Sequence, residues 1–248
     1  MVTKIEQQAA FNKIMSGLNP AQKKAVDNME GPVMVIAGPG TGKTQILGAR
    51  IGKILLESDT RPENILCLTY TDAGVVAMRK RLLDFIGPDA YKVNLYTFHA
   101  FCNDIIQENL SLFEKTILDP ISDLERIALF KTLIDQFPKN HPLKRYRGDV
   151  YFEINNLQQL FSTMKKEGWT PEYIDGCIDA FIADMPNREE FVYKRAYKGF
   201  KAGDLKESKV EEEKEKMEKL KAAVAAFPVF QEMMRAKNRY DFDDMINW

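Results

Sequence analysis

The sequence predicts an α/β fold joined to a second, all-helical part, and two observations carry this prediction. Over roughly the first 110 residues, short apolar runs of strand length alternate with segments of helix length. This alternation is typical of a parallel sheet with helices on its faces. Strand patterns then nearly vanish, and long helix-like segments follow up to residue 236, which is typical of an all-helical domain.

The first predicted strand is the apolar run over 33–36, which we expect to be buried. A glycine-rich stretch follows it: Ala37-Gly38-Pro39-Gly40-Thr41-Gly42-Lys43-Thr44. This stretch matches the phosphate-binding loop of nucleoside triphosphatases, with Ala in place of the first Gly. Glycines let backbone N–H groups turn toward phosphate oxygens, and the helix predicted over 45–56 adds its positive N-terminal end. The strand–loop–helix context separates this match from a chance glycine-rich turn.

The side chains around this loop predict how a nucleotide is held. We expect the Lys43 ammonium to reach the β- and γ-phosphates and the Thr44 hydroxyl to coordinate Mg²⁺. Upstream, Asn19 and Pro20 favour a helix start, with Gln22 on its first turn. Alone, Gln22 is read as a polar helix-surface residue, but its place beside the loop favours a hydrogen bond to an adenine edge. The predicted nucleotide-binding residues are Gln22, Gly38, Pro39, Gly40, Thr41, Gly42, Lys43, Thr44 and Gln45, with Lys43 and Thr44 catalytic and Thr44 the metal ligand.

Two further strand–helix pairs are predicted downstream. A strand over 65–68 leads into Thr69-Tyr70-Thr71-Asp72 and a helix that Gly87-Pro88 stops. A strand over 93–96 runs into Thr97-Phe98-His99 and another helix. Ligands of parallel sheets gather at the carboxyl ends of the strands, where these polar and aromatic residues and the phosphate loop fall.

Composition excludes some classes of protein. The chain has 248 residues, 45% of them hydrophobic, and a net charge of -1, so any nucleic-acid surface must be local. Its apolar runs are far shorter than a membrane span, and the N-terminus lacks a secretory pattern. The three cysteines have no CxxC spacing and predict reduced, buried thiols in a cytoplasmic protein. They are Cys67, Cys102 and Cys177.

The helices predicted for the second part span 122–137, 150–167, 171–184, 188–200 and 204–236. The charged run over 211–221 is predicted to be a solvated helix with pairs such as Glu212–Lys216 and Glu215–Lys219. Two basic groups are typical of nucleic-acid surfaces, and a basic surface loop explains the first of them almost as well. The first comprises Lys139, His141, Lys144, Arg145 and Arg147 around Tyr146, and the second comprises Lys194, Arg195, Lys198 and Lys201 interleaved with Tyr193 and Tyr197.

With these motifs in hand, the chain resembles the N-terminal part of UvrD/Rep/PcrA-type superfamily 1 DNA helicases. Residues 18–22 look like their adenine-reading Q motif, 37–44 match their first motif, and 69–72 and 97–101 resemble the next two. Residues 164–168, 171–173 and 241–245 resemble further stretches of the same family, in the same order. Where the family usually has Asn-Lys and a Glu, this chain has Asp72, Ala73 and Ala77. A Lys and a Glu are therefore missing from the expected DNA-backbone contacts.

The resemblance implies a P-loop NTPase (RecA-like) α/β fold with an inserted all-helical subdomain. Residues 1–109 and 237–248 would form part of the ATP-binding motor domain, and 110–236 the insertion. The implied activity is that of an ATP- and Mg²⁺-dependent DNA helicase or translocase with 3′-to-5′ polarity. It would act on single-stranded DNA and single-strand/duplex junctions, together with the remaining helicase domains.

The resemblance also implies roles for the residues at the strand ends. Tyr70 and Phe98 would offer stacking faces to bases, and Thr71, Thr97 and His99 would bond the phosphate backbone. Without the resemblance, the two aromatic residues fit a buried core equally well, and a structural role is favoured for His99.

Hydrolysis needs a carboxylate for Mg²⁺, a group that positions water, and an arginine. In the family the first two belong to a DExx box after a hydrophobic strand, and the second motor domain supplies the arginine. Neither element is found here, and Asp243 and Asp244 read better as part of a helix N-terminus. The chain is therefore predicted to be a truncated fragment without hydrolysis of its own. The alternatives are a complete small P-loop enzyme and a non-catalytic nucleotide- or DNA-binding module.

Overall fold

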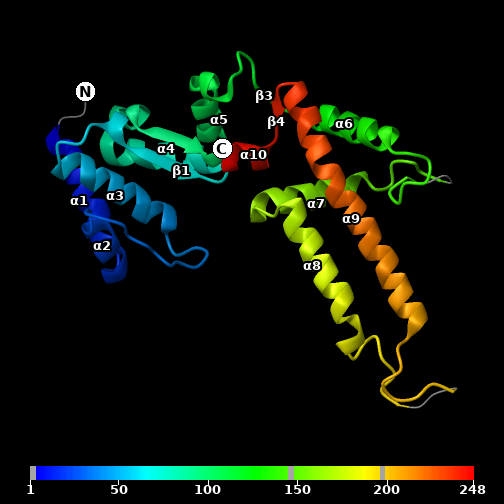
Figure 1. The fold of residues 1–248 in the computed structure, drawn as a ribbon. Coiled ribbons are helices and arrows are strands. Elements are labelled where there is room, and N and C mark those ends of the chain that lie inside the picture. Colours follow the sequence, from blue (N-terminus) through cyan, green and yellow to red (C-terminus); the bar gives the residue numbers. More distant parts are fainter. Residues whose placement is uncertain (1–3, 145–147, 196–198) are drawn as a thin grey trace. The chain divides into compact units, whose positions relative to one another are not determined.

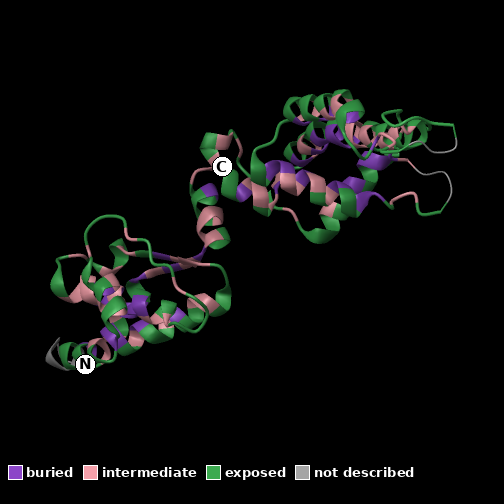
Figure 2. Cartoon of the chain, turned by 90° about the horizontal axis from the view of Figure 1, so that it is seen from below, coloured by how far each residue is buried: buried purple, intermediate pink, exposed green. Residues whose placement is uncertain are grey.

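The computed structural model describes residues 4–144, 148–195 and 199–248 (Figure 1). The chain forms two compact units, 1–105 and 106–248. Each unit has its own set of buried residues, which lie between its helices (Figure 2). None of the helices in the described residues combines the length and the apolar character that crossing a membrane requires.

The first unit alternates helices with two short parallel strands, as the sequence predicts. Strands β1 and β2 pair in parallel, with Leu66 opposite Asn94 and Thr69 opposite Thr97. The elements are α1 (Lys4–Ser16), α2 (Pro20–Asp27), α3 (Lys43–Glu57), η1 (Pro62–Asn64), β1 (Leu66–Thr69), α4 (Asp72–Ile86), η2 (Gly87–Lys92), β2 (Asn94–Thr97) and α5 (Phe98–Glu108).

The prediction of a buried strand over 33–36 is wrong. These residues form no strand, and the side chains of Met34 and Ile36 are 87% and 90% exposed. A strand exists only through hydrogen bonds to a neighbouring strand, and within the described part of this unit the sheet consists of β1 and β2. The apolar pattern indicates which residues favour a sheet, but it carries no information on the partner.

Helices α3 and α4 approach closely because α3 carries a glycine at their contact. A Cβ atom at Gly48 would lie 2.9 Å from Cε2 of Phe85. Phe85 also packs edge-on against Phe11 of α1, with ring centroids 6.4 Å apart. Leu82, fully buried, completes this part of the core. The packing fixes α3, and with it the loop that precedes α3.

The second unit is mainly helical. Helices predicted over 122–137, 171–184 and 204–236 are confirmed within a few residues, and the one predicted from 150 begins at Ile154. The elements are η3 (Leu110–Phe113), β3 (Asp119–Pro120), α6 (Asp123–Gln136), α7 (Ile154–Glu167), α8 (Pro171–Asp184), η4 (Met185–Asn187), α9 (Glu207–Ala236), β4 (Arg239–Tyr240) and α10 (Phe242–Asn247). Strands β3 and β4 pair in parallel.

The helix predicted over 188–200 is wrong for the described residues of that segment. Phe191 and Tyr193 instead take part in a hairpin, in which Val192 and Leu205 form an antiparallel bridge. Gly199 and Gly203 both have φ near +95°, a backbone conformation that favours glycine. The helical periodicity of the side chains is overridden by backbone hydrogen bonds from this segment to residues 203–206.

Aromatic rings form the centre of the second core. Phe130 stacks on Phe230 with centroids 4.2 Å apart, and Phe161 lies 5.6 Å from Phe130. On the charged half of α9, the predicted pair of Glu212 with Lys216 is confirmed at 3.0 Å. Lys219, in contrast, pairs with the buried carboxylate of Glu153 at 2.7 Å and not with Glu215.

Two further expectations concern the burial of the cysteines and the place of residues 237–248. Of the three cysteines, Cys67 is buried, Cys102 is half-buried and Cys177 is exposed, so the expectation of buried thiols holds for the first alone. Burial raises the pKa of the Cys67 thiol.

The segment 237–248, expected to join the first domain, packs here within the second unit through β4 and α10. Its assignment, and that of 1–109 and 110–236, to helicase subdomains remains a prediction.

Candidate nucleotide and nucleic-acid site

The glycine-rich loop takes the backbone conformation that its residues favour. Gly40 and Gly42 have φ of 72° and 83°, in the left-handed region that glycine tolerates best. Gly42 is the N-terminal cap of α3, so the helix begins at Lys43. The Thr41 hydroxyl donates to the Gly38 carbonyl over 2.7 Å. Thr44 follows on the first turn of α3 and is exposed, and the N–H groups of that turn form a ready anion-binding end.

Lys43 folds back over its own loop. Its Nζ donates to the carbonyl oxygens of Ala37 at 3.1 Å and Gly38 at 2.9 Å. The side chain is exposed, so its ammonium remains accessible to a ligand. A phosphate oxygen is a charged acceptor and makes a stronger hydrogen bond than these neutral carbonyls. The donors present, one ammonium and the amide groups of a helix N-terminus, fit a nucleotide phosphate.

Gln22 lies against this loop. It forms a capping box with Asn19, in which each backbone N–H donates to the other's side-chain oxygen over 2.9 Å. Its Nε2 donates to the Thr41 carbonyl over 3.0 Å. A Cβ atom on Gly42 would lie 3.1 Å from the same nitrogen. The expected proximity of Gln22 to the loop is confirmed, while its contact with adenine remains a prediction.

Arg50 is a residue of this region that the sequence analysis missed. Its guanidinium donates to the carbonyls of Ala25 at 3.1 Å and Met29 at 3.3 Å, which ties the end of α2 to α3. Lys53, one turn on, pairs with Asp27 of α2. Both cations follow Lys43 on α3, but their spacing in the sequence does not identify these partners, which lie in or just after α2. A cavity of about 330 Å³ lies here, lined by Ala25, Val33, Val35, Lys43, Ile46, Leu47 and Arg50.

The carboxyl ends of β1 and β2 bring two predicted DNA-contacting aromatics together. Because Thr69 pairs with Thr97, the next residues along each strand are neighbours. The rings of Tyr70 and Phe98 lie 5.1 Å apart at 45°. Tyr70 is 86% exposed and Phe98 is half-buried. The pair therefore presents an open aromatic surface and is not part of the core.

The polar residues at these strand ends begin the following helices. The Thr71 hydroxyl accepts from the Gly74 N–H and the Thr97 hydroxyl from the Ala100 N–H, each over 3.1 Å. The exposed Thr71 keeps its hydroxyl proton as a donor for a phosphate oxygen, whereas Thr97 is buried, with 9% of its surface exposed. Gly74 is required here, because a Cβ atom would collide with the hydroxyl of Thr69. His99 is exposed on the first turn of α5.

The carboxylates of 241–244 form a helix cap, as the sequence predicts. Asp241 caps α10, and its box with Asp244 is complete. Lys165 of α7, whose side chain is 4% exposed, pairs with Asp241 at 2.6 Å and Asp244 at 2.9 Å. Asp243 accepts from the Ser162 hydroxyl over 2.5 Å. Within the described residues, no group of three or more His, Cys, Asp or Glu side chains is arranged to hold a metal ion.

The pKa values of these two carboxyls shift in opposite directions. Burial raises the pKa of Asp244 above its ordinary value. Burial acts in the same direction on Asp241, but the nearby Lys165 ammonium more than offsets it and lowers the pKa of Asp241. Both carboxyls pair with the same buried ammonium of α7. The cluster is thus a structural link between α7 and α10.

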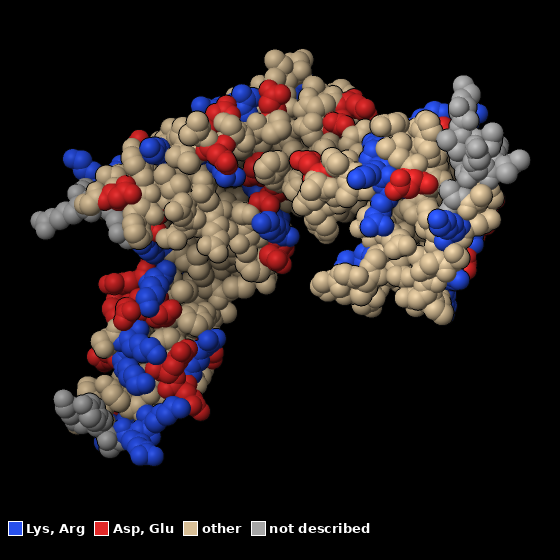
Figure 3. Space-filling view, turned by 180° about the vertical axis from the view of Figure 1, so that it is seen from behind, with Lys and Arg blue, Asp and Glu red and all other residues tan. Residues whose placement is uncertain are grey.

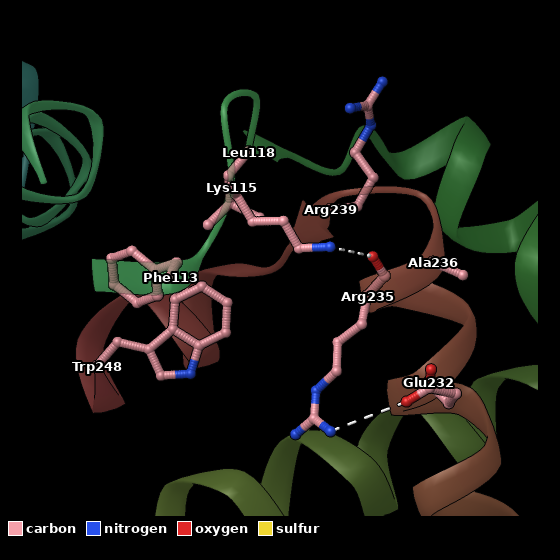
Figure 4. A pocket seen from close by; sticks show the side chains of 8 residues that line it. All are labelled: Phe113, Lys115, Leu118, Glu232, Arg235, Ala236, Arg239 and Trp248. Carbon is pink, nitrogen blue, oxygen red and sulfur yellow. Dashed lines mark hydrogen bonds and ion pairs between the residues drawn. The ribbon is translucent and has the colours of Figure 1, made fainter. Parts of the chain in front are cut away.

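A separate cavity of about 360 Å³ lies in the second unit (Figure 4). Trp248 packs on Phe113 along one side, with ring centroids 5.2 Å apart. The cations around it have partners: Lys115 donates to the Arg235 carbonyl, and Arg239 pairs with Asp119 and Glu125. Contacts within the protein account for these charges, and we assign no ligand to this cavity.

The two basic groups predicted from the sequence lie in different structural settings. In the first, Arg145, Tyr146 and Arg147 lie outside the described residues, and Lys144 donates to the carbonyls of Asp135 and Phe137. That lysine therefore stabilises the loop itself. In the second group, Tyr197 and Lys198 lie outside the described residues, and the others belong to the hairpin between α8 and α9.

Comparison with known proteins adds independent findings. The model of the UvrD/REP helicase N-terminal domain matches residues 18–248. The chain is 37% identical over 181 residues to the ATP-dependent DNA helicase PcrA of Bacillus subtilis (strain 168), which covers 71% of this chain and 24% of that protein. It is 31% identical over 166 residues to PcrA of Staphylococcus epidermidis (strain RP62A), covering 65% and 21%. For PcrA of Staphylococcus aureus (strain Mu50) the identity is 30% over 159 residues, covering 62% and 21%. The chain thus spans between a fifth and a quarter of the length of these relatives.

Proposed function

The chain belongs to the UvrD/REP helicase family through the N-terminal domain of that family, and on this premise we propose that it binds ATP with Mg²⁺ and single-stranded DNA. The nucleotide would bind at the loop of residues 37–44 and the DNA at the ends of β1 and β2. The whole protein would be an ATP-dependent DNA helicase or translocase with 3′-to-5′ polarity. It would act at single-strand/duplex junctions, together with its remaining domains.

The single observation that carries this proposal is the geometry of the glycine-rich loop. Lys43 lies over the loop, with its ammonium on two loop carbonyls. Helix α3 begins at that same residue, so its N-terminal amides and the ammonium converge on one place. Bound ATP would supply the phosphoanhydride bond whose cleavage drives translocation. Lys43 would neutralise the phosphates and Thr44 would contribute one ligand to Mg²⁺.

The DNA part of the proposal rests on the exposed pair of Tyr70 and Phe98. A ring that is 86% exposed and braced by a second ring 5.1 Å away offers a face to a base of any sequence. Thr71, Thr97 and His99 lie on the same strand ends and would contact phosphates. Such contacts position the strand without reading its sequence.

We further propose that these 248 residues alone bind ATP without appreciable turnover. Hydrolysis needs a Mg²⁺-binding carboxylate, a group that positions water and an arginine for the developing charge. The carboxylates of Asp241 and Asp244 are engaged by Lys165, and Asp243 by Ser162. The expected turnover of the isolated chain is therefore that of the buffer, measured by phosphate release with and without DNA.

The DNA part is tested by Tyr70→Ala. Loss of one stacking face should cost about 1–3 kcal/mol of binding free energy, which lowers the affinity for an oligothymidylate by roughly 5- to 150-fold. The measurement is fluorescence anisotropy of a labelled oligonucleotide at fixed salt. Tyr91→Ala is the matched control, because Tyr91 is 68% exposed but lies before β2 begins, at the opposite edge of the sheet.

The control should bind DNA like the unsubstituted chain. Equal losses in both variants would remove Tyr70 from the proposed site. A different result would be binding of ATP by the unsubstituted chain without any binding of single-stranded DNA, even at low salt. That result would favour the alternative that the chain is a small P-loop nucleotide-binding protein that does not bind DNA.

A further inference from the structure

Three buried, ionisable side chains join α7 to α10, here called the buried cluster and consisting of Lys165, Asp241 and Asp244. The Lys165 ammonium lies 2.6 Å from the Asp241 carboxyl and 2.9 Å from the Asp244 carboxyl. The three side chains are 4%, 14% and 13% exposed. The Asn247 amide also donates to the Lys165 carbonyl over 3.0 Å. The packing of α10 on α7 therefore centres on one ammonium and two carboxyls that water barely reaches.

The charges that α7 and α10 bring to this contact do not balance. Besides Lys165, α7 ends with Lys166, whose side chain is 64% exposed and whose ammonium lies 3.7 Å from Asp243 of α10. The Asp243 carboxyl also accepts from the Ser162 hydroxyl over 2.5 Å. With Asp241 and Asp244, α10 has three carboxyls against two lysines. Lys166 lies beside the outer carboxyl, which leaves Lys165 with the two buried ones.

Other ionisable groups around α10 have partners outside the buried cluster. In the described part of the chain, no second cation pairs with Asp241 or Asp244, and the neighbouring strand β4 and helix α9 direct their charges elsewhere. These groups and their partners are Arg239 with Asp119 and Glu125, Arg235 with Glu232, Lys115 with the Arg235 carbonyl, and the Tyr240 hydroxyl with the Gln107 amide.

Solvent makes such an imbalance harmless at the surface. Figure 3 shows acidic and basic side chains interspersed along the arm that α8 and α9 form, and Lys216 there lies close to both Glu212 and Glu213. Water and salt screen these charges. A second carboxylate in a buried site lacks that screening, so its ionisation beside the first costs free energy, and uptake of a proton removes the cost.

The geometry distinguishes the carboxyl that stays ionised from the one that takes the proton. Asp241 has the shorter contact with Lys165, and its carboxyl accepts from the Asp244 N–H over 2.9 Å. The Asp244 carboxyl accepts from the Asp241 N–H over a longer 3.2 Å. Shorter charge-assisted hydrogen bonds stabilise the ionised form more. The pKa shifts agree: burial raises the pKa of Asp244, whereas at Asp241 the Lys165 ammonium more than offsets burial and lowers the pKa.

We propose that the buried cluster is a proton-operated latch, in which Asp244 takes up a proton in mildly acid solution and thereby tightens α10 on α7. With that proton in place, Lys165 and Asp241 form a neutral pair, and the Asp244 carboxyl still has an oxygen that accepts. Loss of the proton leaves an uncompensated buried charge and loosens α10. The inference goes beyond the function proposed above, since it needs neither nucleotide nor DNA.

The direction of the pH dependence follows from the two shifts. A carboxyl whose pKa is raised on folding adds stability that is present below its ordinary value of 3.8 and is lost as the pH rises through the raised value. Asp241 does the reverse, because its contribution is present above 3.8 and is lost as the pH falls through the lowered value. The buried cluster therefore stabilises the second unit more in mildly acid than in neutral solution.

The test compares two asparagine variants of the full chain by urea unfolding, followed by tryptophan fluorescence. Asp244→Asn imitates the protonated carboxyl and should raise the urea midpoint at about pH 7 by roughly 0.3–1 M. As the pH falls to about 5, the unsubstituted chain gains its own proton, and the two midpoints should converge. Asp241→Asn keeps a good helix cap but removes the ionised partner of Lys165, so it should lower the midpoint at both pH values.

Asp243→Asn is the matched control, because it removes a carboxylate from the same turn of α10 but beside the exposed Lys166. Its difference in midpoint from the unsubstituted chain should be the same at about pH 7 and about pH 5. A lower midpoint for Asp244→Asn at neutral pH, or a difference that does not shrink in acid, overturns the proposal.

An NMR titration of the aspartate carboxyl carbons in the unsubstituted chain decides the question even where a variant fails to fold. One carboxyl should titrate above the ordinary value for aspartate, in the direction given by the burial of Asp244. Titration of every aspartate at or below that value overturns the latch. Neither measurement contains ATP or DNA, so its failure leaves the proposed function untouched.

Discussion

Lys43→Ala is expected to weaken binding of ATP with Mg²⁺ by roughly ten- to a hundredfold while the fold survives. The size follows from the hydrogen bonds that an ammonium makes to charged phosphate oxygens, about 1.5–3 kcal/mol for such contacts. The fold should survive because the side chain is exposed and its present partners are the carbonyls of Ala37 and Gly38. Calorimetric titration with ATP measures the affinity, and circular dichroism measures the fold.

The control for this substitution is Lys80→Ala, which removes the same charge from an exposed position on α4. It should leave the affinity for ATP within about twofold, because screened charges at a distance contribute little. An unchanged affinity in Lys43→Ala, or an equal loss in both variants, would end the proposed role of Lys43.

Lys165→Met is expected to give the largest loss of stability, about 3–5 kcal/mol in the free energy of unfolding of the second unit. The substitution leaves Asp241 and Asp244 buried beside each other without their shared cation. Both tryptophans, Trp169 and Trp248, belong to this unit. Urea unfolding followed by tryptophan fluorescence therefore reports on the unit directly.

The adjacent lysine supplies the control. Lys166 is 64% exposed and lies 3.7 Å from Asp243, so Lys166→Met should cost less than about 1 kcal/mol. Adding Asp241→Asn and Asp244→Asn to Lys165→Met should restore part of the lost stability, since the uncompensated charges are then removed. Equal costs for the two lysine variants would contradict the account of the buried cluster.

Features set by neighbouring residues were predictable from the sequence. The start of α2 at Pro20, the cap at Asp241 and the start of α3 after Gly42 each depend on a few adjacent residues. The parallel pairing of β1 and β2 follows from two strands joined by one helix. That pairing in turn places Tyr70 beside Phe98, so the candidate DNA site was largely predictable too.

Features that depend on distant partners were not predictable. The apolar residues over 33–36 fit a strand, but hydrogen bonds from a second segment decide whether one forms. The pairing of Lys165 with carboxylates more than seventy residues away cannot be predicted from the spacing of residues in the sequence. The carbonyl acceptors of Arg50 could not be predicted either, because every residue has a backbone carbonyl. Periodicity also failed over 188–200, where backbone hydrogen bonds to residues 203–206 replace those of a helix.

The most direct test of the central claim is hydrogen–deuterium exchange of the unsubstituted chain with and without ATP and Mg²⁺. The account predicts slower exchange of the amides over 38–45, because the backbone N–H groups of the loop and the first turn of α3 would donate to phosphate oxygens. Exchange in α7 and α8 of the second unit should not change. Unchanged exchange over 38–45 at saturating nucleotide, or protection confined to the second unit, would contradict the proposed nucleotide site.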